Sequence, residues 1–588
     1  MAPPTERVVM AAVAATAVTW TVALAVLPIM NYDTLMYQLP VVAEWLQAGS
    51  FAGHQEQWVG RATHEPAILH YPGSWNALFL LVVAVTGHDQ FVFWPNLVAW
   101  GLIGLCTRGV ARLHGAAPGG ATAAAALAML LPLVGIGLPS AHLDLGFAAA
   151  TLLSIYAAVH AGRRGDGLSL ALAVAAGGLL IGVKFTGFAA LAFAVALLLW
   201  ELRGRAQRAA LAADLGSRRW PMWLAIAGFC LLGASWYARN LLVTGTPFGW
   251  VRVAILGHEL FPGFIDARFV ALTSMRGNLR FDAYHLLVLA QAAAWYLGIA
   301  AVAIIGLCAG GARAVVNRPA LLAPLALVAL ALAWSHVAGP WSAKHAQEAL
   351  RWDWMGQQLR YTFALWGVLA ALGAAACGAV DRPLRWVAAA CGLAALWLPG
   401  MTAREWGLTV APWMTAATAL GLALALRQLG VSLRPALPWP GRRTTLAAIP
   451  VVLAGLWFGG RWRLAETDRA YWGVAGFLAR DVAASEPVAF WGSHQSYLLY
   501  GPDLRRPVRY LPLEGCADAD AVAAVVAASG MRYLMIGEIY PPQHRHVLDW
   551  LRLDPVRFPV AYGDPATWGA DVYLIGREPS APAARPVH

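Results

Sequence analysis

The stretch VVMAAVAATAVTWTVALAVLPIM, residues 8–30, is an uninterrupted apolar run long enough to cross a membrane. A helix needs about 20 apolar residues to span a hydrocarbon core about 30 Å thick. Similar runs recur as far as Trp462 and then stop. Because 59% of the 588 residues are hydrophobic and only 12% are charged, the chain has too few charges to cover a globular surface of this size. The sequence therefore predicts a polytopic α-helical membrane protein.

The connections between the apolar runs predict the orientation of the chain. Arginine-rich connections alternate with arginine-poor ones, and basic residues in short loops face the cytoplasm. We therefore expect a cytoplasmic amino terminus, with residues 31–90 and everything after 463 outside the cytoplasmic (inner) membrane of a bacterial-type cell. About 13 transmembrane helices are expected, at 8–30, 91–108, 119–138, 141–161, 168–183, 185–201, 221–243, 285–311, 320–339, 361–380, 384–400, 406–427 and 445–462.

The first outward loop, residues 31–90, contains two further helical segments. The stretch from Trp75 to Val85 is apolar but short for a span, which favours a re-entrant or interfacial helix. Residues 33–48 mix polar and apolar side chains after an aspartate, which is typical of an amphipathic helix lying along the outer face. The loop therefore carries juxtamembrane helices.

The carboxyl end of the chain has a different pattern. Short apolar segments separated by turns replace the long runs, with an alanine-rich helical segment, ADADAVAAVVAASG (residues 517–530), between the second and third. Strands alternating with helices indicate a small α/β domain. We expect two domains: a transmembrane domain, 1–463, and an extracytoplasmic α/β domain, 464–588. The five segments are PVAFWG, PVRYLP, MRYLMIG, RFPVAYG and DVYLIG.

The composition excludes several functions. The net charge of +11 comes from arginines in the short loops, which set membrane orientation and do not indicate a nucleic-acid partner. The six cysteines form neither a disulfide framework nor a metal-binding spacing. The carboxyl domain contains no GxGxxG or GxxxxGK[ST] nucleotide-binding motif.

Acidic and histidine residues of the outward connections are candidates for catalysis. Asp33 follows the first span directly, with Tyr37 one helical turn later, so its carboxylate is a candidate base at the membrane boundary. The alternative is a helix N-cap, and the two roles are compatible. The segment THEPAILHYPGSWN contains Glu65 and two histidines and could bind a metal or a sugar, but it has no defined ligand spacing, which favours the alternative of an ordinary polar loop. His142 and Asp144 lie at the mouth of a span, where ionisable groups are costly unless paired, hydrated or functional.

A few basic residues of the outward connections are candidates for an anion site. Only Lys184 and Lys344 are lysines among the 42 Lys and Arg residues, and an ammonium differs from a guanidinium as a phosphate partner. Chance retention is the alternative. Arg239 and Arg360 lie near outward ends of spans, where each arginine could merely extend to the interface or could join an anion site around one outward cavity. Asn240 and Tyr361 follow these two arginines directly.

Several motifs together resemble those of a known family. They are Asp33 with Tyr37 and Pro40, the KFTG turn at 184–187, WYARNLLVTGTPF at 236–248, the Arg360–Tyr361 pair and the small outward α/β domain. In this order the chain resembles bacterial membrane glycosyltransferases of the GT-C fold, especially relatives of the dolichyl-phosphate-mannose protein mannosyltransferases and the aminoarabinose transferases.

The resemblance implies an inverting glycosyltransferase that moves a sugar from a polyprenyl-phosphate carrier to an extracytoplasmic acceptor such as a glycan, a lipid or a protein. It implies Asp33 as the general base. It leaves a divalent metal ion open, because Gln38 stands where these relatives often have histidine and Glu65 aligns loosely with their second acidic residue. The resemblance further implies Lys184, Arg239 and Arg360 as donor-phosphate ligands and Tyr37, Glu65, His142, Asp144, Asn240 and Tyr361 as substrate-binding residues.

Three other functions remain as alternatives. A transporter or flippase should show inverted repeats and ionisable residues in mid-membrane, whereas the ionisable residues here gather at outward ends. A lipid-linked polysaccharide ligase or polymerase has no evident need for the Asp33 loop. A membrane scaffold leaves the polar outer loops unexplained.

Overall fold

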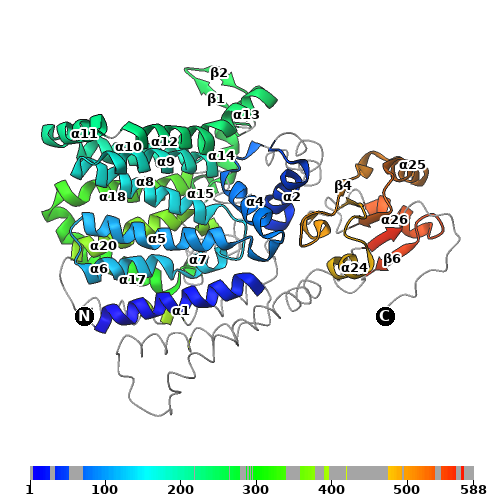
Figure 1. Ribbon diagram of the computed structural model, residues 1–588, viewed down its shortest axis with the longest axis horizontal. Helices are drawn as coiled ribbons and strands as arrows, with labels where there is room; N and C mark the ends of the chain where they lie inside the picture. Colours follow the sequence, from blue (N-terminus) through cyan, green and yellow to red (C-terminus); the bar gives the residue numbers. More distant parts are fainter. Residues whose placement is uncertain are drawn as a thin grey trace, which may run out of the picture.

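The protein is a bundle of long helices with a small sheet-containing unit at one end (Figure 1). Six helices among the described residues are long and apolar enough to cross a membrane, or seven if the bent pair α10 and α11 counts as one span. The chain is therefore a multi-pass membrane protein. The computed structural model describes residues 4–26, 33–51, 70–217, 219–249, 251–263, 265–278, 287, 290–291, 293, 296–338, 358–377, 390–391, 393–395, 419, 474–492, 496–536, 545–563 and 571–574.

The bundle is built from helices that match the predicted spans to different degrees. Those before the first strand are α1 (Pro4–Val26), α5 (Trp94–Leu113), α6 (Pro118–Met129), α7 (Pro132–Gly137), α8 (Asp144–Arg164), α9 (Gly167–Val183), α10 (Gly187–Glu201), α11 (Arg205–Ser217), α12 (Arg219–Phe229), η5 (Cys230–Ala234) and α13 (Ser235–Thr244). They are followed by α14 (Ala267–Thr273), α15 (Met275–Asn278), α17 (Gly298–Asn317), α18 (Pro319–Ala338), η6 (Leu359–Thr362) and α20 (Phe363–Cys377).

One predicted span is interrupted, and others lie beyond what the structure describes. The stretch 119–138 divides into α6 and α7, because Pro132 lacks the backbone N–H that would continue the helix. The predicted spans 384–400, 406–427 and 445–462 lie largely or wholly outside the described residues. The number thirteen therefore stays a prediction.

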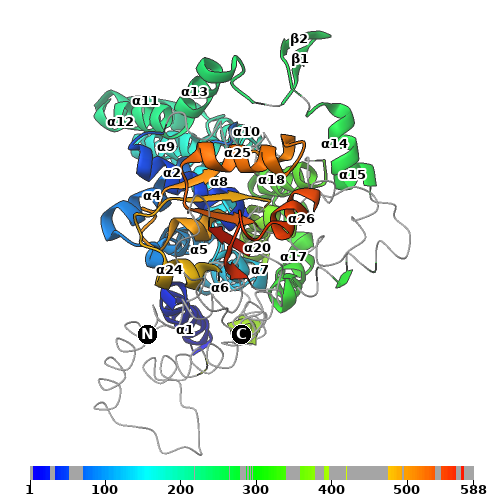
Figure 2. The same cartoon turned by 90° about the vertical axis from the view of Figure 1, so that its right-hand side faces the viewer.

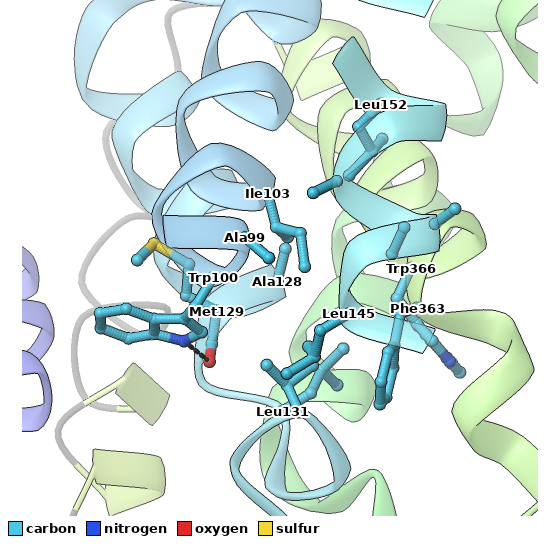
Figure 3. Packing of buried hydrophobic residues seen from close by; sticks show 14 of the residues in the cluster. Ala99, Trp100, Ile103, Ala128, Met129, Leu131, Leu145, Leu152, Phe363 and Trp366 are labelled. Atoms are coloured by element: carbon cyan, nitrogen blue, oxygen red, sulfur yellow. Dashed lines mark hydrogen bonds between the residues drawn. The ribbon is translucent and has the colours of Figure 1, made fainter. Parts of the chain in front are cut away.

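Small residues and interlocking large ones hold the centre of the bundle together. Helices α5, α6, α8 and α20 pack against one another, and Figure 3 shows Ile103, Leu145, Leu152 and Phe363 meeting between them. Trp100 lies at the edge of this core and donates from Nε1 to the Met129 carbonyl over 2.9 Å, so its one polar atom is satisfied inside the apolar core.

One end of the bundle carries Asp33, His142, Asp144, Lys184 and Arg360, and we call it the site end. Helix α8 begins there at Asp144 and has its arginines in its last turn, while α9 runs back and ends just before Lys184. Gly182 lets α9 approach η5 closely, since a Cβ at this position would overlap the Leu232 carbonyl oxygen. The close crossing of α9 and η5 fixes the position of the chain that leads into Lys184.

Three short helical elements cover the site end: η1 (Thr34–Gln38), α2 (Leu39–Ala48) and α4 (Ser74–Thr86). η1 is a π-helix, a rare form that is frequent at functional sites. α4 has 13 residues and is too short to span, as the sequence predicts, and η1 with α2 forms the predicted helix of residues 33–48. Trp45 of α2 stacks on Trp236 of α13 with ring centroids 5.5 Å apart, which ties the covering helices to the bundle.

A small hairpin follows α13. Its strands, β1 (Val253–Ile255) and β2 (His258–Phe261), pair in antiparallel fashion. In Figure 1 the hairpin projects from the side of the bundle beyond α13. Its turn carries Leu256 with a positive φ of 51° and a side chain that is 95% exposed.

The carboxyl part folds around a mixed sheet of five strands in the order β4-β3-β5-β7-β6. β4 and β5 run parallel to β3, while β7 is antiparallel to both β5 and β6. The sheet unit lies across the site end (Figure 2). Each strand overlaps one of the five segments predicted from the sequence. The elements are α24 (Val474–Asp481), β3 (Val488–Trp491), η7 (Ser496–Tyr500), β4 (Val508–Tyr510), η8 (Leu513–Gly515), α25 (Ala519–Ser529), β5 (Tyr533–Ile536), α26 (Arg545–Leu553), β6 (Val560–Gly563) and β7 (Asp571–Leu574).

Candidate active site

A cavity of about 860 Å³ opens at the site end of the bundle. This volume suits a sizeable small-molecule substrate, since ligand pockets measure about 300–1,000 Å³. Residues from η1, the turn before α8, the α9–α10 turn, α13, α18 and η6 line it. The cavity brings together seven of the ten residues singled out from the sequence: Asp33, Tyr37, His142, Asp144, Lys184, Arg360 and Tyr361.

Asp33 is held by charge and not by helix capping. It precedes η1 but makes no side-chain hydrogen bond to that helix; its Oδ2 instead lies 3.0 Å from Arg360 Nη2 and 3.1 Å from His142 Nε2. Burial alone would raise the pKa of Asp33, but Arg360 and His142 outweigh it and hold that pKa well below its usual range. Asp33 is therefore a carboxylate, and the capping alternative does not describe its side chain.

His142 shares this cluster as a neutral ring. Burial first and the neighbouring Arg360 guanidinium second lower the pKa of His142, against the opposing effect of Asp33. Arg360 Nη1 lies 2.7 Å from His142 Nε2. The same nitrogen lies 3.1 Å from Asp33 Oδ2, so the ring, which is only 13% exposed, lies between the arginine and the carboxylate.

Asp144 links the arginine to the lysine. Its Oδ2 lies 3.4 Å from Arg360 Nε, and its Oδ1 accepts a hydrogen bond from Lys184 Nζ. Lys184 also lies over the Tyr361 ring, 4.4 Å from the ring centroid, which is a cation–π arrangement. The Lys184 side chain is still 24% exposed and lines the cavity.

An aromatic wall lies beside this ion cluster. Phe185, Phe188, Tyr237 and Phe248 line the cavity and contact one another, with ring centroids 5.1 to 6.0 Å apart. Phe188 is 40% exposed on α10. Three of the four belong to the KFTG and WYARNLLVTGTPF motifs, so the sequence marked these segments but not their aromatic members.

The predicted pair Arg239 and Asn240 lies elsewhere. Neither residue lines the cavity. Asn240 is 3% exposed and donates from Nδ2 to the His70 carbonyl over 2.9 Å, while Arg239 Nη1 donates to Asn240 Oδ1 over 3.1 Å. Because residues 70–72 do line the cavity, Asn240 supports its wall from behind. On the helix, the neighbouring Tyr237 points to the cavity instead.

Two further cavity residues were not singled out from the sequence. Arg252, beside the β1–β2 hairpin, pairs with Glu259 at 2.6 Å, and both side chains are partly exposed. His336 near the end of α18 is 9% exposed and has no hydrogen-bond partner on either ring nitrogen. Neither residue belongs to a motif, so only the packing of the helices reveals them.

Metal binding finds no support among the described residues, which contain no group of three or more His, Cys, Asp or Glu side chains placed to hold an ion. Glu65, the acidic residue that the resemblance linked to a metal, lies outside the described residues. The divalent ion therefore stays an open part of the sequence-based expectation.

The arrangement suits a reaction in which a proton is removed beside an anionic leaving group. Asp33 supplies an ionised oxygen at the cavity wall, and Lys184 supplies a cation on the far side of Asp144. An apolar wall next to these charges suits a ligand that carries a hydrocarbon chain on an anionic group.

No protein-family model and no curated protein sequence matches the chain. Solved structures do. The crystal structure of ArnT from Cupriavidus metallidurans in the apo state is similar with a TM-score of 0.51 at 16% sequence identity, over 96% of this chain and 98% of that chain. The crystal structure of the same protein bound to undecaprenyl phosphate gives a TM-score of 0.50 at 14% identity over the same shares. At these identities the likeness is one of fold.

Proposed function

We propose that this protein, which has the fold of the GT-C membrane glycosyltransferases, is an inverting glycosyltransferase that uses a polyprenyl-phosphate-linked sugar. The acceptor is an extracytoplasmic glycan, lipid or protein. One observation carries the proposal: a single cavity combines the Asp33 carboxylate, the Lys184 ammonium and an aromatic wall. Each of the three serves a different part of such a reaction.

The proposed chemistry is a single displacement at the anomeric carbon. Asp33 accepts the proton of the acceptor group as the acceptor bonds to that carbon. The bond from the carbon to the phosphate oxygen breaks, and the phosphate leaves with the electron pair. Because a phosphate is already a weak base, Lys184 and Arg360 stabilise its developing charge and no general acid is needed.

The aromatic wall suits the hydrocarbon chain of the donor. Phe188 of α10 is 40% exposed, and helices α12 and α13 expose Trp223 and Leu242 by 69% and 86%, as lipid-facing helices do. A prenyl chain lying against this side has its phosphate near Lys184. The likeness to a structure bound to undecaprenyl phosphate supports this class of donor.

Replacing Lys184 with alanine should weaken use of the donor while leaving dependence on the acceptor nearly unchanged. The ammonium is the exposed cation of the cluster, and Arg360 still pairs Asp144 after the change. In nanodiscs, undecaprenyl phosphate should raise the melting temperature of the wild type but not of Lys184→Ala, and the KM for a polyprenyl-phosphate sugar should rise.

Lys184→Arg is the matched control, since it keeps the charge and should retain part of the stabilisation. Polyprenol without phosphate should stabilise neither protein. Equal losses towards donor and acceptor in Lys184→Ala would contradict a phosphate role. Binding of the donor by the wild type with no release of polyprenyl phosphate, in the presence of envelope extract as acceptor, would instead indicate a transporter or flippase.

We further propose that the site end and the carboxyl domain, from about residue 464, lie outside the cytoplasmic membrane. Arginine-rich ends of α8 and of the α10–α11 connection lie opposite the site end, as the positive-inside rule requires. A reporter that is active only in the cytoplasm should be silent when it is fused after His588. Activity of that fusion would reverse the orientation of the whole site.

A further inference from the structure

The sheet unit reaches into the bundle close to the candidate base. Its residues 496–506, here called the docking segment, comprise η7 and the turn after it. η7 packs directly on η1 and α2. Tyr497, Tyr500 and Leu504 are each at most 2% exposed and belong to the same hydrophobic core as Leu35 and Leu39 of the η1–α2 segment. The docking segment is thus part of the bundle core.

Hydrogen bonds join the docking segment to Asp89 and to α2. Tyr497 donates from its hydroxyl to Asp89 Oδ2 over 3.0 Å, and Asp89 N donates to the Pro502 carbonyl over 2.8 Å. From α2, Gln47 Nε2 donates to the carbonyls of Leu504 and Arg506, each over 2.9 Å. These four hydrogen bonds therefore join the sheet unit to the rest of the chain.

The backbone of the docking segment is shaped for this contact. Leu504 has a positive φ of 57°, which is unfavourable for a residue with a branched side chain. Arg506, 4% exposed, donates to the carbonyls of Leu499, Leu478 and Val482 and so braces the segment against its own domain. An unfavourable conformation persists where surrounding contacts determine it.

Further hydrogen bonds hold η1, from the turn before α8 and from α4. Thr34 Oγ1 accepts from Ala141 N over 2.7 Å, next to His142, and Asn76 Nδ2 donates to the Gln38 carbonyl over 3.0 Å. These hold the two ends of η1, whereas η7 packs against its length. Since Asp33 directly precedes η1 and Tyr37 lies within it, a shift of η1 moves both side chains in the cavity.

We propose that the carboxyl sheet unit positions the catalytic base. The docking segment is anchored by the bond from Tyr497 to Asp89 and by the bonds that Gln47 donates, and it holds η1 so that Asp33 faces the cavity. This inference rests on the proposed function for its kinetic consequence only. Tyr497 and Gln47 are positioning residues, because they act through η1 and touch neither the cavity nor the reacting groups. The sheet unit is then a working part of the transferase site.

The test opens the contact from both sides with Tyr497→Phe combined with Gln47→Ala. The matched control is Tyr510→Phe, which removes a hydroxyl bond of similar length, 2.9 Å to Glu514 Oε2, within the sheet unit itself. In nanodiscs, hydrogen exchange at the amides of η1 should rise in the double variant and stay at the wild-type level in the control. Unchanged exchange at η1 in the double variant would overturn the proposal.

Measurement of kcat distinguishes a positioning role of the docking segment from a general structural defect. The double variant should lower kcat by about 10- to 100-fold, because small misplacement of a catalytic group costs up to about 10²-fold. Combined with Asp33→Asn it should lower kcat no further, since the contact acts through Asp33. A multiplicative loss in the Asp33→Asn background would show a structural defect and overturn positioning. If wild type transfers no sugar, the proposed function fails, and the exchange measurement still decides whether the sheet unit holds η1.

Discussion

Asp33→Asn should slow glycosyl transfer by about 10² to 10⁴-fold, the usual loss when a general base is removed. The amide keeps the size of the side chain and an oxygen for Arg360 and His142, but it cannot accept the acceptor's proton. Because the Asp33 side chain caps no helix, capping is not lost with it. The measurement is the rate at which the purified variant releases polyprenyl phosphate from a lipid-linked sugar.

Asp166→Asn is the control for this substitution. Asp166 caps the opposite end of α9 through the amides of Leu168 and Ser169, a role that asparagine fills nearly as well. It should transfer sugar at the wild-type rate. Asp33→Asn should still be stabilised by undecaprenyl phosphate, which separates lost basicity from lost binding. Near-normal transfer by Asp33→Asn would move the search for the base to Asp144 or Glu65.

Arg360→Met should destabilise the protein more than any other single change in the cavity. The Arg360 side chain is 14% exposed, and its guanidinium pairs with two carboxylates, Asp33 and Asp144. Removing one partner of a buried ion pair typically costs about 3 to 5 kcal/mol, because it leaves charge buried without compensation. Transfer should also be lost, since neither the base nor the leaving phosphate keeps its cation.

The loss of stability in Arg360→Met should depend on pH. In the wild type, Arg360 keeps the pKa of Asp33 below its unfolded value, so the pair stabilises the protein above about pH 4 and loses that effect in acid. Without Arg360 the carboxylates are better tolerated when protonated, so the deficit in melting temperature should be largest at neutral pH and shrink below about pH 4.

Arg360→Lys keeps the charge but not the planar fork that reaches several partners at once, so it should recover stability only partly. A deficit in Arg360→Met that does not change with pH would mean that the arginine contributes packing alone.

The sequence predicts the site residues best where a charged residue stands at the end of a long apolar run. Asp144 and Lys184 are unusual because they stand next to long apolar runs, and the structure joins them in one ion pair. The five short strands are marked by turns, so their positions follow from local pattern alone. Both are properties of neighbouring residues in the chain.

The residues that the sequence misses depend on rotation and distance in three dimensions. Tyr237 and Arg239 are two positions apart on one helix and differ by about 200° around its axis, so only one can face the cavity. The contact between the rings of Tyr237 and Phe188 of α10 turns Tyr237 towards the cavity. His336 reaches the cavity because α18 crosses beside η6, a contact between segments that no local pattern relates.

A buried glutamate lies beside the docking segment. Glu44 of α2 is 6% exposed, and neither of its carboxyl oxygens has a hydrogen-bond partner. Burial raises the pKa of Glu44 to about 9, so the group is neutral at pH 7. Helix α2 packs on η7, and burial first and the nearby Glu44 second raise the pKa of Tyr500 in η7.

Association of the sheet unit with α2 is therefore linked to proton uptake. Where the contact opens and water reaches Glu44, its pKa returns towards the ordinary value of 4.5 and the proton is released. Below about pH 4.5 both states hold the proton and the contact is strongest. As pH rises from there towards 9, each pH unit weakens the closed state by about 1.4 kcal/mol, so an acidic medium favours the closed arrangement.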